Sequence, residues 1–137
     1  MIIVSSCLAG CHCRYDGDSK PNEKVINLVA DGKAFPVCPE QLGGLPTPRL
    51  PSEKRGNKVF RNDGVDVTDE FEKGAREALR FAKLVNARKA ILKARSPSCG
   101  SGKIYDGSFS LHLIEGDGVF ADLCKREGII IRTEEEI

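Results

Sequence analysis

The chain lacks the features that mark several large classes of protein. It has no tryptophan and only 6% aromatic residues, so it offers few rings on which single-stranded nucleic acid could stack. Its formal net charge of +1 over 137 residues gives no electrostatic attraction for nucleic acid or for an anionic membrane surface. No apolar run approaches the length needed to cross a bilayer. These absences weigh against nucleic-acid and membrane partners, and they leave the oligomeric state open.

The start of the chain, Met1–Val4, lacks the basic leader and long apolar stretch of a secretory signal. We therefore expect a cytoplasmic protein. In a reducing compartment its six cysteines are expected to be metal ligands, reactive thiols or small buried side chains rather than disulfides. The length predicts one domain that comprises residues 1–137.

Short apolar segments alternate with segments of helical periodicity. Strands are expected near residues 2–6, 34–38, 89–94 and 129–131, and helices are expected to begin near Asn22, Thr68 and Val119. This alternation predicts an α/β fold with a small parallel sheet of about four strands in a flavodoxin- or Rossmann-like three-layer arrangement. We favour the strand order second, first, third, fourth.

Residues 39–67 show no clear periodicity and contain many glycines and prolines. We expect them to form a long loop or lid within the domain, because such a loop in a small domain is usually functional. Its charged second half, Glu53–Arg61, could form a hairpin. The stretch after the third strand is expected to be a loop, and Glu134–Glu136 a solvated tail.

Three cysteines share the same position relative to an expected strand. Cys7, Cys38 and Cys99 each follow an apolar segment at its carboxyl end, and parallel strands deliver such residues to one edge of the sheet. We favour a metal or iron–sulfur site with three thiolates over three unrelated buried thiols, because packing alone gives cysteine no reason to follow a strand three times. The chain has no C-x-x-C pair, so it matches neither a zinc ribbon nor a ferredoxin pattern.

The remaining cysteines are less easily interpreted. Cys11 and Cys13 could provide a fourth ligand or a second small site, or they could simply lie in a loop. The distinction matters because four thiolates saturate a [4Fe–4S] cluster, whereas three leave one iron open as a Lewis acid. Cys124 is expected in the core, beside Leu123.

Acid–base candidates flank these cysteines. Glu40 comes two residues after Cys38 and could move protons at the site. Asp16 is a second candidate, and Asp106 is better explained by a turn. Hydroxyl groups of Ser98 and Ser101 lie beside Cys99 in the sequence and could hold an anion or the carbonyl of a heterocycle.

Four segments together resemble a known family. They are Ser5-x-Cys7-Leu8-x-Gly10, Arg14-Tyr15-Asp16-Gly17, Val37–Arg49 and Ser96-Pro97-Ser98-Cys99-Gly100. They are similar to a small bacterial and archaeal family that includes the thiouracil desulfidases, and the resemblance covers nearly the whole chain. It implies a [4Fe–4S] cluster held by Cys7, Cys38 and Cys99, with an open fourth iron that binds the substrate sulfur. It also implies Glu40 as the acid, with Asp16 and a serine of the last loop as helpers.

The leading hypothesis is therefore a non-redox desulfidase that removes sulfur from a thiolated heterocycle such as thiouracil and releases sulfide. An alternative is a non-catalytic iron–sulfur, metal or sulfur carrier in which Cys11 or Cys13 provides a fourth ligand. A third is a thiol enzyme that forms a persulfide on Cys11 or Cys13.

Overall fold

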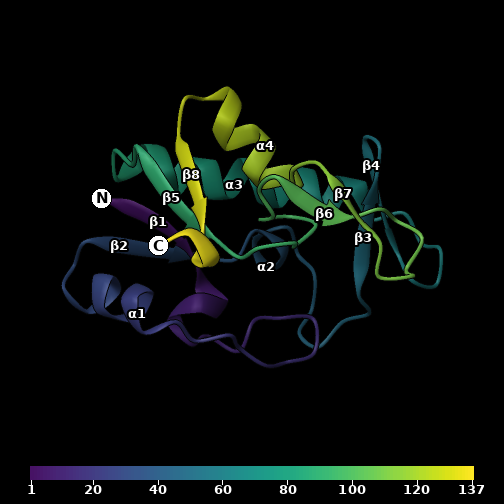
Figure 1. Ribbon diagram of the computed structural model, residues 1–137, viewed down its shortest axis with the longest axis horizontal. Helices are drawn as coiled ribbons and strands as arrows, with labels where there is room; N and C mark the ends of the chain where they lie inside the picture. The colour runs from purple at the N-terminus through teal and green to yellow at the C-terminus, as the bar shows by residue number, and fades with distance from the viewer.

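A four-stranded parallel sheet forms the centre of the computed structural model, which describes residues 1–137 (Figure 1). The strands lie in the order β2-β1-β5-β8, and they are β1 (Ile2–Ser5), β2 (Ala34–Val37), β5 (Lys89–Leu92) and β8 (Ile130–Thr133). All three pairings are parallel. The predicted α/β class and strand order are confirmed.

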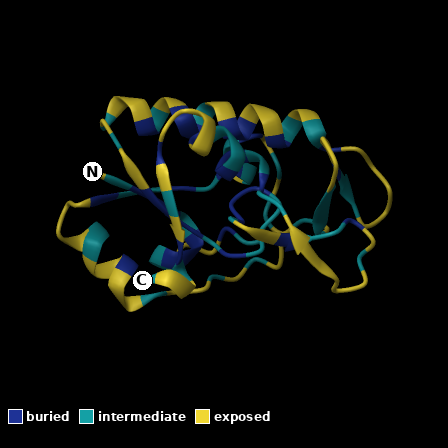
Figure 2. Ribbon diagram, turned by 45° about the horizontal axis from the view of Figure 1, so that its top comes forward, coloured by how far each residue is buried: buried dark blue, intermediate teal, exposed yellow.

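Helices cover both faces of the sheet (Figure 1). Helix α1 (Glu23–Ala30) lies on one face, and α3 (Thr68–Leu84) and α4 (Val119–Arg126) lie on the other. The alternation of side chains along β1 separates two cores, because Ile3 packs toward α3 and α4 whereas Val4 packs toward α1. Figure 2 shows the helices burying the surfaces that face the sheet and exposing the others. None of them is long and apolar enough to cross a membrane.

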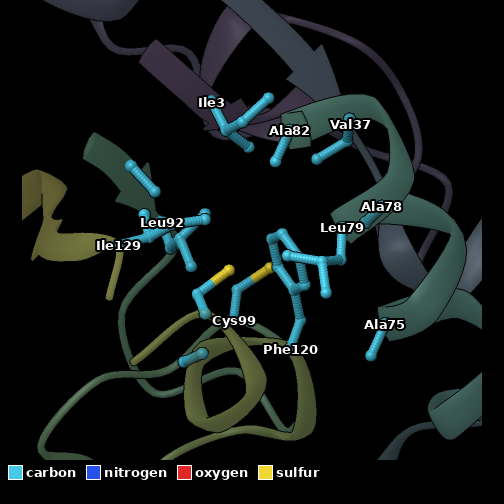
Figure 3. Packing of buried hydrophobic residues seen from close by; sticks show 13 residues of the cluster. Ile3, Val37, Ala75, Ala78, Leu79, Ala82, Leu92, Cys99, Phe120 and Ile129 are labelled. Carbon is cyan, nitrogen blue, oxygen red and sulfur yellow. The ribbon is translucent and has the colours of Figure 1, made fainter. Parts of the chain in front are cut away.

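The larger core lies between the sheet and the pair α3 and α4 (Figure 3). Ile3, Leu92 and Phe120 are fully buried there, and each large apolar side chain contributes about 1.5–3 kcal/mol by leaving water. Helix α3 contributes small residues such as Ala78 and Ala82, both fully buried. These alanines allow the helix to lie close to the sheet.

Two hairpins extend beyond the end of the sheet (Figure 1). One is formed by β3 (Ser52–Arg55) and β4 (Lys58–Arg61), and the other by β6 (Lys103–Tyr105) and β7 (Leu113–Glu115). The hairpin expected within 53–61 is confirmed. The long loop expected over residues 39–67 also contains the short helix α2 (Pro39–Leu42). The expectation of a loop after β5 was wrong, because that stretch contains the β6–β7 hairpin.

Two expectations at the ends of elements need correction. Thr68 is the first residue of α3 rather than its N-cap, and its hydroxyl accepts a hydrogen bond from the Val59 amide at 2.9 Å. The acidic tail is not free in solvent. Residues Glu134–Glu136 form a short 3₁₀ helix, η2, and Glu134 accepts from the Ala94 amide at 2.7 Å and pairs with Lys93 at 2.8 Å.

Helices α2 and α3 meet backbone to backbone. A Cβ atom at Gly74 would overlap the carbonyl oxygen of Pro39, and one at Gly43 would overlap the carbonyl of Glu70. Both obstacles are rigid backbone rather than flexible side chains. Glycine at these two positions therefore allows α2, which follows Cys38 directly, to sit against α3.

We expect Gly74→Ala to destabilise the protein by about 1–3 kcal/mol, because the new methyl group overpacks this contact. In an ordinary exposed helix position the same change stabilises by about 1 kcal/mol. The free energy of unfolding in urea measures the effect. Lys73→Ala, at the exposed neighbouring position, is the control and should change stability by less than about 0.5 kcal/mol. Equal stability of the two variants would contradict the close contact.

Candidate functional site

A cavity of about 600 Å³ opens at the carboxyl edge of the sheet. Its floor is formed by the loops that follow β1, β2 and β5, and residues of both hairpins contribute to its walls. Four cysteines line it: Cys7, Cys13, Cys38 and Cys99. The cavity is the place where the chain brings thiols together.

The three strand-end cysteines reach this cavity by short routes. Cys7 lies in the 3₁₀ helix η1 (Ser6–Ala9) that continues β1, and Cys38 precedes α2 directly after β2. Cys99 lies in the loop after β5. Cys7 and Cys99 are buried and Cys38 is partly buried, and all are free thiols. The structure therefore brings together the three residues that the strand pattern indicated.

The loop that carries Cys99 is held on several sides. The Ser96 hydroxyl accepts hydrogen bonds from the amides of Ser98 and Cys99 at 3.1 and 3.0 Å. The first turn of α4 binds the same loop, because the Phe120 amide donates to the Ser98 carbonyl at 2.8 Å. Cys99 also belongs to the main core beside Phe120 (Figure 3). Its thiol is thus presented from a rigid support.

Glu40 lies on the cavity wall between a serine and an arginine. Its Oε2 accepts a hydrogen bond from the Ser98 hydroxyl at 2.8 Å. Its Oε1 accepts from Nε of Arg49 at 3.1 Å and pairs with Nη2 at the same distance. The Ser98 hydroxyl is also 3.7 Å from the Cys99 sulfur. A carboxylate, a hydroxyl and a thiol from distant parts of the chain therefore form one connected group.

Arg49 is the residue that sequence reasoning missed. Its side chain is only 7% exposed, and it also donates to the carbonyl oxygens of Cys13 and Pro46 at 2.9 and 3.1 Å. The guanidinium thereby fastens the Cys13 loop to the helix that carries Glu40. Its position among prolines gave no periodic signal, because its partners are set by the tertiary fold.

The two cysteines of the loop after η1 have opposite environments. Cys13 is 4% exposed and lines the cavity, and its carbonyl lies 3.9 Å from the Cys38 sulfur. Cys11 is exposed and does not line the cavity. Cys124 is fully buried in the core, as expected. Cys13 alone of the two loop cysteines is placed to act with the strand-end thiols.

The surroundings of Cys13, Cys38 and Cys99 raise the pKa of each of these thiols and so favour the protonated form. Burial raises the pKa of the Cys99 thiol to about 12, although nearby serine hydroxyls lower it. For Cys13, contact with Cys38 lowers the pKa, but contact with Cys7 and burial raise it to about 12. The Cys38 pKa is raised by contact with Cys13 and by burial. Thiolates are therefore stable here only when a cation takes the place of the protons.

This donor set suits an iron–sulfur cluster. No three His, Cys, Asp or Glu side chains converge around one point in the way a single metal ion requires. Three thiols from three separate loops instead share a cavity wall, and three thiolates can bind three of the four irons of a [4Fe–4S] cluster, one each. Cys7, Cys38 and Cys99 fit that requirement.

Two predicted helpers lie elsewhere. The side chain of Asp16 is 41% exposed, accepts from the Asp18 amide at 3.0 Å and pairs with Arg14 at 3.5 Å. Although desolvation opposes the shift, these two contacts lower the pKa of Asp16. Neither Asp16 nor Ser101 lines the cavity. Asp16 was expected at the site from the family resemblance and Ser101 from its place beside Cys99 in the sequence, but the turns in which they lie direct them elsewhere.

The fold and the cavity define a class: a small α/β protein whose sheet edge carries a site of buried thiols beside a carboxylate. The family model of the 2-thiouracil desulfurases matches residues 2–136, and the chain belongs to that family. The predicted family resemblance is confirmed.

Two relatives are similar over most of their length. The uncharacterized protein YbbK of Bacillus subtilis (strain 168) is 46% identical over 147 aligned positions, which include all of this chain and 97% of YbbK. A solved structure of the [4Fe-4S]-dependent thiouracil desulfidase TudS is also 46% identical. It superposes with a TM-score of 0.95 over 99% of this chain and 91% of TudS.

We expect Arg49→Ala to destabilise the protein by about 3 kcal/mol, because it leaves a poorly exposed carboxylate without its cation. Arg49→Lys should fall between this variant and the wild type, since lysine keeps the charge but loses the planar fork. Urea unfolding measures both. Arg80→Ala is the control, because the Arg80 side chain is 73% exposed and pairs only with Glu77 on the same helix, where such pairs contribute little. An equal loss of stability in Arg49→Ala and Arg80→Ala would contradict the role of Arg49 in joining Glu40 to the Cys13 loop.

Proposed function

We propose that the protein is an iron–sulfur-dependent desulfidase that removes sulfur from a thiolated pyrimidine such as thiouracil. The observation that carries this proposal is the meeting of three strand-end thiols with the Glu40–Ser98 pair in one cavity. Membership of the 2-thiouracil desulfurase family supports it, as does similarity to the [4Fe-4S]-dependent TudS. The six free cysteines suit work in the reducing cytoplasm.

In this proposal Cys7, Cys38 and Cys99 hold a [4Fe–4S] cluster. When bound, the cluster supplies an iron that lacks a protein ligand and polarises the carbon–sulfur bond of the substrate as a Lewis acid. The overall reaction consumes a thiocarbonyl group and water and yields a carbonyl group and hydrogen sulfide. Its electrons balance without an oxidant or reductant.

Glu40 and Ser98 handle the protons. Arg49 occupies Oε1 of Glu40, so Oε2 is the oxygen that accepts from Ser98. The carboxylate takes a proton from the attacking water, and the Ser98 hydroxyl passes protons between Oε2 and the region of Cys99, whose sulfur is 3.7 Å away. Arg49 keeps the carboxylate in this orientation.

Anaerobic reconstitution followed by iron and sulfide analysis tests the cofactor, and about four of each per chain are expected for a [4Fe–4S] cluster. Release of sulfide and uracil from 2-thiouracil tests the reaction. We expect Glu40→Gln to keep the cluster and to lower kcat by about 10²–10⁴-fold, because a general base is lost.

Glu77→Gln, on the outer surface of α3 with a 41% exposed side chain, is the matched control and should leave kcat unchanged. A reconstituted wild-type protein that releases no sulfide from any thiolated base would overturn the proposed substrate class. A Glu40→Gln variant with full activity would overturn the role of Glu40.

A second candidate function is a carrier whose cluster is saturated by a fourth thiolate. Cys13 is a better candidate than Cys11 for that fourth ligand, because Cys13 is buried at the cavity wall. The desulfidase and carrier hypotheses predict different results for Cys13→Ser, and Cys11→Ser in the same loop is the matched control.

The desulfidase reading predicts that Cys13→Ser still binds about four irons and still releases sulfide. The carrier reading predicts that Cys13→Ser loses or converts the cluster whereas Cys11→Ser does not. Iron content and the electron paramagnetic resonance spectrum of the reduced protein distinguish these results without relying on turnover.

A further inference from the structure

The two hairpins lie side by side (Figure 1), and residues of both line one side of the cavity, which we call its mouth. Strand β3 contacts β6, and the loop Gly107–Leu111 connects β6 to β7. Tyr105, Phe109 and Leu111 line the cavity from this side. The mouth therefore carries aromatic and apolar side chains beside polar ones such as Glu53, whereas the floor carries Glu40 and the thiols.

The loop Gly107–Leu111 holds two bulky residues in a strained backbone conformation. Phe109 has φ of 58° and Leu111 has φ of 65°, in the left-handed region that non-glycine residues rarely adopt. Each such residue costs about 1–2 kcal/mol. Strain of this kind persists where the surroundings enforce it, and it is concentrated at functional sites.

Glu53 on β3 holds the part of this loop that carries Phe109. Its Oε1 accepts hydrogen bonds from the backbone amides of Gly107 and Phe109 at 3.0 and 3.1 Å. The carboxylate thus bridges the two hairpins and holds the loop from the neighbouring hairpin. Glu53 itself lines the cavity.

Leu111 gains little from its place in the free protein. This residue is 79% exposed, although it lines the cavity. A strained backbone that leaves a leucine in water stabilises nothing in the protein alone. Apolar surface exposed at the rim of a pocket is recovered when a ligand covers it.

We propose that Phe109 and Leu111 are specificity-determining residues that cover the ring of a thiolated pyrimidine at the cavity mouth, and that Glu53 is the residue that positions them. This inference rests on the proposed function for the identity of the ring. The aromatic and apolar side chains at the mouth hold the flat ring, and the floor receives its reacting group. Glu53 acts as a hydrogen-bond acceptor for the loop, so its oxygen matters and its charge does not.

Steady-state kinetics with 2-thiouracil, together with its Kd by equilibrium dialysis, test the proposal. We expect Phe109→Ala and Leu111→Ala each to raise KM and Kd about tenfold, the effect of removing apolar contact with a substrate. Their kcat should change less than about threefold, because ground-state and transition-state contacts are lost equally.

Leu84→Ala is the matched control, since Leu84 at the end of α3 is 76% exposed and lies outside the cavity lining. It should leave KM and Kd unchanged. Glu53→Ala should raise KM as the loop variants do, and Glu53→Gln, which keeps an acceptor oxygen, should restore the wild-type value. The double variant Glu53→Ala/Phe109→Ala should be no worse than either single variant, because both remove the same contact.

The outcomes separate this inference from the proposed function. Turnover with KM and Kd unchanged in Phe109→Ala and Leu111→Ala overturns the inference alone, as does Glu53→Gln behaving like Glu53→Ala. If the wild type binds 2-thiouracil without releasing sulfide, and these variants weaken that binding, the result supports the ring contacts of Phe109 and Leu111 and overturns the proposed desulfidase reaction. A wild-type protein that neither binds nor converts 2-thiouracil overturns both.

Discussion

In-register parallel pairing of four strands is the constraint on which the site depends. Ile2 of β1 lies opposite both Ala34 of β2 and Lys89 of β5. These strands therefore end at the same edge of the sheet, and the loops that follow them lie side by side there. Helices bury both faces of the sheet, and the chemistry is left to that edge. Cysteines separated by most of the chain length meet there without any local sequence signal that joins them.

Electrostatics then decide what the cavity can hold. Burial raises the pKa of Cys99, and contact with Cys13 together with burial raises that of Cys38. For Cys13, contact with Cys38 lowers the pKa, but contact with Cys7 and burial raise it by more. Without metal these three thiols therefore remain neutral. A cationic cluster would replace several protons at once, which links its binding to proton release. Glu40 is negative in the same region, and the guanidinium of Arg49 compensates it.

The cavity is built from parts of different rigidity. Its floor stands on loops tied to the core, as the contacts of Cys99 with Ser96 and with α4 illustrate. Its mouth is formed by two partly exposed hairpins that are joined through Glu53. Rigid floors suit reacting groups that need exact placement, whereas exposed loops vary easily and suit recognition of the substrate. One scaffold can in this way keep a reaction and change its substrate.

The sequence by itself determined the α/β class, the strand order and the three cysteines that meet, because apolar periodicity and the position after a strand are local properties. Only the tertiary structure placed Arg49 between Glu40 and the Cys13 loop, turned Cys13 inward and Cys11 outward, and directed Asp16 away from the cavity. The β6–β7 hairpin also escaped prediction, because every residue of β7 is exposed and burial imposes no alternation on it. These features depend on contacts between residues far apart in the chain, which no local pattern encodes.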